Sequence, residues 1–202
     1  MAGANSRNGE LVLGSRSHRR LDLLRQIGIE PMALDAADID ERPQRNETAT
    51  ALAQRLALAK LAVIAPRHVG CFVLAADTVV AVGRRLLGKP ADATEARRHL
   101  ELLSGRRHRV ITAVAIQAPD GRRAARYAVT QVAFKRLQPD ELDALVEASD
   151  WEGKAGSYAI QGMAEAFIKR IDGSHSNVVG LPLQTTLSLL RGLGWSLRTG
   201  TQ

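Results

Sequence analysis

The sequence contains few of the features that mark specialised classes of protein. Among its 202 residues there is one cysteine, Cys71, so an intramolecular disulfide scaffold is excluded. Aromatic residues make up only 3%, which leaves few rings for stacking on single-stranded nucleic acid. No uninterrupted apolar run approaches the roughly 20 residues of a membrane helix, and residues 1–10 are polar, without the apolar centre of a signal peptide. These absences predict a cytoplasmic protein without a membrane partner.

Motifs of several common enzyme classes are also missing. The sequence has no Gly-rich P-loop ending in Lys-Ser/Thr, no dinucleotide-binding Gly fingerprint and no Gly-x-Ser-x-Gly elbow. The histidines, at positions 18, 68, 99, 108 and 175, do not show the spacing of metal ligands, so no zinc site is expected. Cys71 begins an apolar run, which favours a place in the core over a nucleophilic role.

The composition that remains is that of an ordinary globular protein. Hydrophobic residues are 45% and charged residues 24%, and the length favours one domain. The 28 Lys and Arg outnumber 21 Asp and Glu, giving a formal charge of +7. An excess of basic residues is typical of proteins that bind nucleic acid, an anionic membrane or a small polyanion. Alternatively, the basic side chains only keep the surface solvated. Because acidic residues are interleaved with the basic ones and aromatics are scarce, we expect no nucleic-acid partner, although a nucleic-acid-binding or cell-division regulatory protein stays the alternative of a different class.

Strand and helix patterns alternate along the chain without a repeat or linker. Hydrophobic periodicity, caps and turn residues predict strands at 11–14, 71–76, 79–82, 86–87, 110–116, 127–134 and 166–171, and helices at 18–27, 47–65, 92–104, 139–146 and 182–190. This order indicates one α/β domain. We expect a polar N-terminal tail at 1–10, the domain at 11–195 and a C-terminal tail at 196–202.

The apolar run 71–76 is predicted to be a central strand that ends at Asp77-Thr78. Active-site groups of α/β sheets gather at the carboxyl ends of strands, and a carboxylate there can hold Mg²⁺ or accept a proton from water. A simple turn beginning with Asp-Thr is an equally good interpretation of these two residues alone.

Basic residues occupy positions suited to phosphate. Ser15-Arg16-Ser17-His18-Arg19-Arg20 lies between a predicted strand and a predicted helix, where free backbone N–H groups and the helix dipole favour anions. The alternative is a Ser cap followed by solvated arginines. Lys89 lies between Gly88 and Pro90 on a predicted loop, and Lys60 falls on the apolar side of its helix, where it either extends to solvent or reaches into a cleft. Glu41 belongs to an acidic loop segment.

Six motifs follow one another along the chain: Leu13 to Arg20 with Leu23-Leu24 and Gly28, Ala76 to Val80, Gly88-Lys89-Pro90, Leu103-Ser104-Gly105 with His108, Gly153 to Gly162, and Asn177 to Pro182. Their order, from about residue 11 to residue 190, resembles the Maf family of nucleoside triphosphate pyrophosphatases. The resemblance implies a mixed sheet flanked by helices, related to the inosine triphosphate pyrophosphatases. It also implies a divalent cation, Mg²⁺ or Mn²⁺, a nucleoside triphosphate as substrate, and a possible homodimer.

The resemblance also implies roles for individual residues. Asp77 would be the catalytic proton acceptor, and Asp77 with Glu41 would hold the metal. The triphosphate would be bound by Ser15, Arg19, Arg20, Lys60 and Lys89. Arg19, Thr78 and Gln161 match the positions that set base specificity in the branch acting on dTTP and UTP, which makes those two the expected substrates.

Two positions depart from the family pattern. His18 stands where the family usually has Pro, and Gly153 precedes Lys154 where Asp is common. The same chemistry on CTP, 7-methyl-GTP or another modified nucleotide is the alternative within the family, and it would change only the meaning of Arg19 and Gln161.

Overall fold

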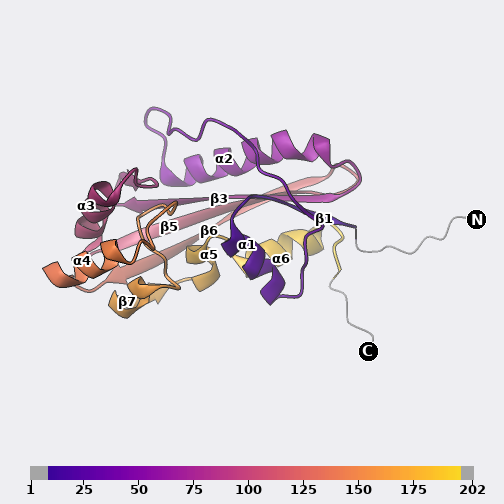
Figure 1. The fold of residues 1–202 in the computed structure, drawn as a ribbon. Coiled ribbons are helices and arrows are strands. Elements are labelled where there is room, and N and C mark those ends of the chain that lie inside the picture. Colours follow the sequence, from indigo (N-terminus) through magenta and orange to yellow (C-terminus); the bar gives the residue numbers. More distant parts are fainter. Residues whose placement is uncertain (1–8, 197–202) are drawn as a thin grey trace, which may run out of the picture.

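The computed structural model describes residues 9–196 and has one mixed seven-stranded sheet with helices on both faces (Figure 1). The strand order is β2-β1-β3-β5-β6-β7, with β4 paired to β3. The strands are β1 (Leu11–Gly14), β2 (Ala33–Leu34), β3 (Phe72–Val82), β4 (Arg85–Leu87), β5 (Arg107–Gln117), β6 (Arg123–Phe134) and β7 (Ile168–Asp172). The α-helices are α1 (His18–Gln26), α2 (Ala49–Ile64), α3 (Ala93–Leu103), α4 (Pro139–Glu147), α5 (His175–Val179) and α6 (Leu183–Gly192). Short 3₁₀ turns occupy Ala65–Arg67 and Met163–Phe167.

Strand β3 is the central strand and is covered on both faces, as its apolar run predicts. It pairs parallel with β1 and antiparallel with β5. Because side chains alternate along a strand, Leu74 joins the core under α1 and α6, whereas Val73 joins the core under α2. A third cluster, which includes Leu100, Leu103 and Tyr158, fills the end of the molecule near α3 and α4.

The expected end of this strand at Asp77-Thr78 is wrong, because β3 continues to Val82. The neighbouring strand β1 ends here instead, since its last pair with β3 is Gly14 with Ala75. On the same side, β4 begins to pair with β3 only at Val80. Residues 76–79 therefore have β5 on one side and a gap in the sheet on the other. The gap gives a polar residue in a buried strand access to a cleft, and this is the feature of the fold that positions the site.

Helix α2 covers one face of the sheet (Figure 1). The stretch Ala49–Arg67 is long and apolar enough, at a mean hydropathy of 1.2, to cross a membrane by length and composition alone. Its Leu52, Leu56, Leu61 and Ile64 are buried against the sheet, which is how a core helix of a folded domain behaves.

Local sequence signals place most other elements correctly. Asp92 caps α3 by accepting a hydrogen bond from the Glu95 backbone N–H at 2.8 Å, and Pro139 is the first residue of α4. The strand expected at 166–171 is shifted, since a 3₁₀ turn precedes β7. The strand β2 and the five-residue helix α5 are absent from the expectation, because both are too short to show periodicity. Residues 1–8 and 197–202 of the expected tails lie outside the described residues.

Cys71 lies at the edge of the core, packed against the cluster under α2, and not within it as its apolar run suggests. It precedes β3 and is partly exposed, with its Sγ 4.0 Å from the Met32 Sδ. Partial burial raises the pKa of its thiol, so the less reactive protonated form is favoured.

Candidate functional site

A cleft of about 980 Å³ opens at the gap in the sheet. Its walls come from the loop after β1, from the loop before α2 and α2 itself, from the middle of β3, from the loop after β4, and from the 153–161 and 178–180 segments. This volume lies at the upper end of those of small-molecule pockets, so a ligand as large as a nucleotide fits.

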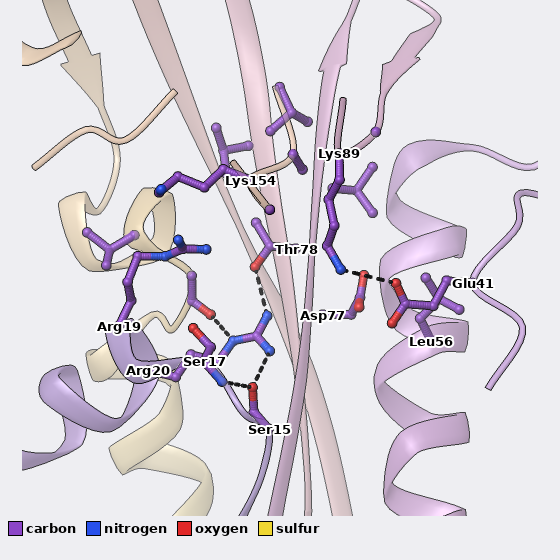
Figure 2. A pocket seen from close by; sticks show the side chains of 18 of the residues that line it. Ser15, Ser17, Arg19, Arg20, Glu41, Leu56, Asp77, Thr78, Lys89 and Lys154 are labelled. Carbon is purple, nitrogen blue, oxygen red and sulfur yellow. Dashed lines mark hydrogen bonds and ion pairs between the residues drawn. The ribbon is translucent and has the colours of Figure 1, made fainter. Parts of the chain in front are cut away.

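One wall of the cleft holds a cluster of two carboxylates and two lysines. Asp77 points to the α2 face of β3, where the Lys60 ammonium contacts its Oδ1 at 2.5 Å. The same ammonium lies 2.6 Å from Glu41 Oε1, and Lys89 approaches Glu41 Oε2 at 3.6 Å. Figure 2 shows Glu41 and Asp77 next to each other with Lys89 above them. Lys60 thus reaches from the apolar side of its helix into a cleft, one of the two outcomes its position allows.

The two carboxyl groups have different proton affinities because they are buried to different extents. Asp77 is 7% exposed, and burial raises its pKa above the ordinary value despite the opposing charges of Lys60 and Arg20. Burial acts on Glu41 in the same direction, but the hydrogen bonds and charges of Lys60 and Lys89 outweigh it and lower the pKa of Glu41. Asp77 is therefore a stronger base than an ordinary aspartate, and Glu41 is a carboxylate that stays ionised.

The opposite wall is organised by Arg20 on the first turns of α1. Its Nη1 donates to Ser15 Oγ at 3.1 Å, its Nη2 to Thr78 Oγ1 at 3.2 Å and its Nε to the Gly180 carbonyl at 2.8 Å (Figure 2). These contacts join the loop after β1, the middle of β3 and the end of α5. They leave two of the five guanidinium N–H groups for a ligand.

A line of buried hydroxyl and amide groups supports Arg20 from behind. Thr78 Oγ1 lies 3.0 Å from Thr112 Oγ1, and Thr112 donates to the Asn177 carbonyl at 3.0 Å, so the Thr78 hydroxyl is the donor of the first pair. The Asn177 Nδ2 in turn donates to the Val110 carbonyl and to Thr130 Oγ1. Because buried polar groups are costly to leave unpaired, this line restricts the rotamer of Thr78 and the place of Arg20.

Arg19 and Lys154 face each other across the mouth of the cleft (Figure 2). Within residues 9–196, neither has a carboxylate at ion-pair distance. Burial and the charge of Arg19 lower the pKa of Lys154. Two neighbouring cations without a salt-bridge partner form a site of uncompensated positive charge, which attracts anions.

The 153–162 segment forms the loop that carries Lys154 and Gln161. Gly156 adopts φ of 78°, and a Cβ there would lie 2.9 Å from a methyl carbon of Val80, so only glycine lets this loop lie so close to β3. Gln161 is exposed and lines the cleft.

The structure brings together every residue that the sequence nominates for the site. The cleft is lined by Ser15, Arg19, Arg20, Glu41, Lys60, Asp77, Thr78, Lys89 and Gln161. Sequence reasoning did not single out Lys154 or the Thr112–Asn177 support. The Gly-rich sequence around Lys154 could have indicated a functional loop. Thr112, Thr130 and Asn177 lie far apart in the chain, and no local sequence pattern predicts that they come together.

The two departures from the family pattern have simple local explanations. His18 is the first residue of α1, the position where proline is favoured but not required. Gly153 has φ of 65°, a conformation that glycine adopts without steric cost.

The fold and the cleft define an α/β protein with a site for a polyanionic ligand beside a buried carboxylate. The chain belongs to the Maf family, since the family model described as Maf-like protein matches residues 10–193.

Curated relatives and a solved structure agree with this membership. The chain is 55% identical over 188 residues to the dTTP/UTP pyrophosphatase of Rhodospirillum rubrum, covering 93% of this chain and 90% of the relative. It is 56% identical over 185 residues to the dTTP/UTP pyrophosphatase of Caulobacter vibrioides, covering 92% and 96%. The Ham1 protein of Staphylococcus aureus shares the fold at a TM-score of 0.50 and 13% identity, with 91% of this chain and 98% of that chain covered.

Proposed function

We propose that this protein hydrolyses nucleoside triphosphates, with dTTP and UTP as preferred substrates, to the nucleoside monophosphate and pyrophosphate. The observation that carries the proposal is the Asp77–Lys60–Glu41 cluster at the gap in the sheet, inside a cleft whose other charged lining residues are cations. The two relatives named above as dTTP/UTP pyrophosphatases support the choice of substrate.

The triphosphate is bound by the cationic wall of the cleft. Ser15, Arg19, Arg20, Lys60 and Lys89 bind phosphate oxygens, and Lys154 adds a further charge beside Arg19. The N-terminus of α1 opens here as well, and the side chain of its N-cap residue, Ser17, makes no capping hydrogen bond. Backbone N–H groups of this first turn are therefore available to an anion.

Asp77 is the proton acceptor. Its Oδ1 is engaged by Lys60, and within residues 9–196 its Oδ2 makes no hydrogen bond, so Oδ2 is the oxygen that takes a proton from water. As the water oxygen bonds to phosphorus, the anhydride bond between the α- and β-phosphates breaks and pyrophosphate leaves with the electron pair. Arg20, Lys89 and their neighbours stabilise the charge that grows on this leaving group.

The donor set of the cleft fits a divalent cation of the Mg²⁺ or Mn²⁺ type. Within residues 9–196 there is no cluster of three or more His, Cys, Asp or Glu side chains suited to a metal. Asp77 and Glu41, both contacting Lys60, provide the one or two carboxylates that Mg²⁺ takes when phosphates and water complete its shell. A cation held there would neutralise charge on the phosphates and make a water molecule easier to deprotonate.

Base choice depends on Gln161, Arg19 and Thr78. The Gln161 amide donates and accepts at once, which matches the N3–H and carbonyl edge shared by uracil and thymine. Thr78 acts on specificity through Arg20, since its hydroxyl is already bonded to Arg20 and Thr112.

We also propose a cytoplasmic location and a homodimer. The substrate pool is cytoplasmic, and sedimentation of the purified protein measures the oligomeric state directly.

A nucleotide panel tests the function. The purified protein is incubated with dTTP, UTP, CTP, 7-methyl-GTP and the standard purine triphosphates, with Mg²⁺ or Mn²⁺, and pyrophosphate release is measured. We expect the highest kcat/KM for dTTP and UTP. A preference for CTP or 7-methyl-GTP would replace the substrate assignment and keep the chemistry, whereas no pyrophosphate from any nucleotide would refute the function.

A further inference from the structure

His99 on α3 contacts the glycine-rich loop of the cleft although it does not line the cleft itself. Its Nδ1 lies 2.7 Å from the Ser157 hydroxyl, and both side chains are largely removed from solvent, with Ser157 at 2% exposed. Ser157 has φ of 63°, a conformation that serine adopts only when its surroundings impose it. The contact thus lies at the point where the loop backbone is most constrained.

The same face of α3 also contacts the loop that carries Lys89. Glu95, one turn before His99, accepts a hydrogen bond from the Ala91 backbone N–H at 2.7 Å. Its other carboxylate oxygen lies 3.9 Å from the His99 Nε2. The two loops also meet directly, because the Gly156 N–H donates to the Gly88 carbonyl at 3.2 Å. Helix α3 therefore connects two loops that carry cleft residues.

The order Ser157, His99, Glu95 resembles that of a hydrolytic triad, but the geometry does not support nucleophilic catalysis. The Ser157 hydroxyl is buried and is not among the described groups that line the cleft. The Glu95 oxygen at 3.9 Å from His99 is also beyond hydrogen-bonding distance. A nucleophile must reach its substrate, so this contact has a different role.

We propose that His99 is a positioning residue that holds the 153–162 loop, and with it Lys154 and Gln161, in place through Ser157. Its kinetic consequences rest on the proposed function, whereas its effect on the loop does not. When neutral His99 carries its proton on Nε2, its Nδ1 accepts a hydrogen bond from the Ser157 hydroxyl. Loss of this bond removes the hydrogen bond between the loop and α3 at Ser157, while the Gly156–Gly88 hydrogen bond and the buried Tyr158 and Ile160 side chains remain to hold the loop. A small displacement of substrate-binding groups is enough to reduce binding strongly.

The test compares His99→Leu, which removes the hydrogen bond, with His99→Asn, which places a polar atom near the position of Nδ1. The matched control is His68→Leu, because His68 also bonds a polar partner, Asp35 at 3.0 Å, and does not line the cleft. Hydrogen exchange of the 153–162 amides and the kinetic constants for dTTP are measured for each variant.

We expect His99→Leu to speed exchange in the 153–162 loop and to raise KM by about tenfold with a smaller change in kcat. In His99→Asn the exchange rate of the loop and the KM for dTTP are expected to stay close to those of the wild type. His68→Leu is expected to change neither quantity. Should His99→Leu fail to fold, Ser157→Gly removes the same bond and suits a φ of 63°, with the same outcomes expected. Exchange in the loop equal to that of the wild type in the folded variant overturns the proposal. If the wild type hydrolyses no triphosphate, the proposed function fails, and the exchange measurement still decides the role of His99.

Discussion

Lys60 on α2 holds Asp77 on β3 at 2.5 Å and at the same time contacts Glu41 at 2.6 Å. The pair links a helix to the strand beneath it at the gap in the sheet beside residues 76–79. Lys60 and Asp77 are each close to 10% exposed, so the cost of desolvating the two charges offsets much of their attraction and the pair is a weak source of stability.

Replacing Asp77 by Asn is expected to lower kcat for dTTP by at least about 10³-fold, because the amide cannot accept a proton from water. The fold is expected to persist, since the amide is isosteric and Lys60 keeps Glu41. Pyrophosphate release and thermal unfolding measure the two effects. Near-normal turnover by this variant would remove Asp77 from the chemistry.

The pH dependence of kcat/KM reports the same carboxylate. Burial raises the pKa of Asp77, and the ionised form is the base, so activity is expected to fall with decreasing pH at a higher pH than an ordinary aspartate would give. The stability effect has the opposite direction: the folded state binds this proton more tightly, so the contribution of Asp77 to stability decreases as pH rises through its folded pKa. A rate profile over acidic pH, on protein shown to be folded by circular dichroism, tests the acid limb, and an acid limb at the ordinary aspartate pKa would contradict it.

Lys154→Met is expected to raise KM for dTTP by about tenfold with a smaller effect on kcat, because it removes one of two neighbouring cations that attract the anionic substrate. The control is Lys169→Met on β7, an exposed lysine that does not line the cleft. Equal KM values for the two variants would show that the charge of Lys154 does not contribute to binding.

Gln161→Ala is expected to reduce discrimination between dTTP and the other triphosphates more than it weakens binding of inorganic pyrophosphate. The reason is that the amide meets the base and not the phosphates in the proposed complex. Ratios of kcat/KM over the nucleotide panel measure this effect. A substrate profile identical to that of the wild type would count against Gln161.

His108 is expected to make the protein less stable at mildly acid pH. Its Nε2 lies 2.7 Å from the Tyr158 hydroxyl, and burial lowers its pKa from 6.5 to about 4. Between these two pKa values His108 is protonated in the unfolded state and neutral in the folded state. The free energy of unfolding therefore decreases as the pH falls from 6.5 to about 4. The loss attributable to His108 from pH 7 to pH 5 is on the order of 2 kcal/mol.

His108→Gln keeps a hydrogen-bonding group near Tyr158 and cannot titrate, so its unfolding free energy is expected to change less between pH 7 and pH 5. Urea denaturation at the two pH values measures the difference. The same pH dependence in both proteins would assign the effect to other groups.

Much of the fold follows from local signals. Asp92 and Pro139 mark helix starts, and the alternation of apolar residues defines the long strands, because caps and periodicity are properties of neighbouring residues. The extent of β3 could not be predicted in this way. A polar pair inside an apolar run ordinarily ends a strand, and only pairing with β5 through Asp77 and Thr78 keeps this one extended. Helix α5 was missed because its five residues are stabilised by the Ser174 cap and by the contacts of Asn177.

The sequence by itself determined the family, the α/β class and the identity of nine cleft residues, because residue types in a fixed order carry that information. The tertiary structure alone decided that Lys60 turns inward, that Arg20 is held by Thr78 and Gly180, and that His99 contacts the loop of Lys154. These contacts join residues far apart in the chain, and their free energy depends on distance and burial, which exist only once the sheet and its helices have packed.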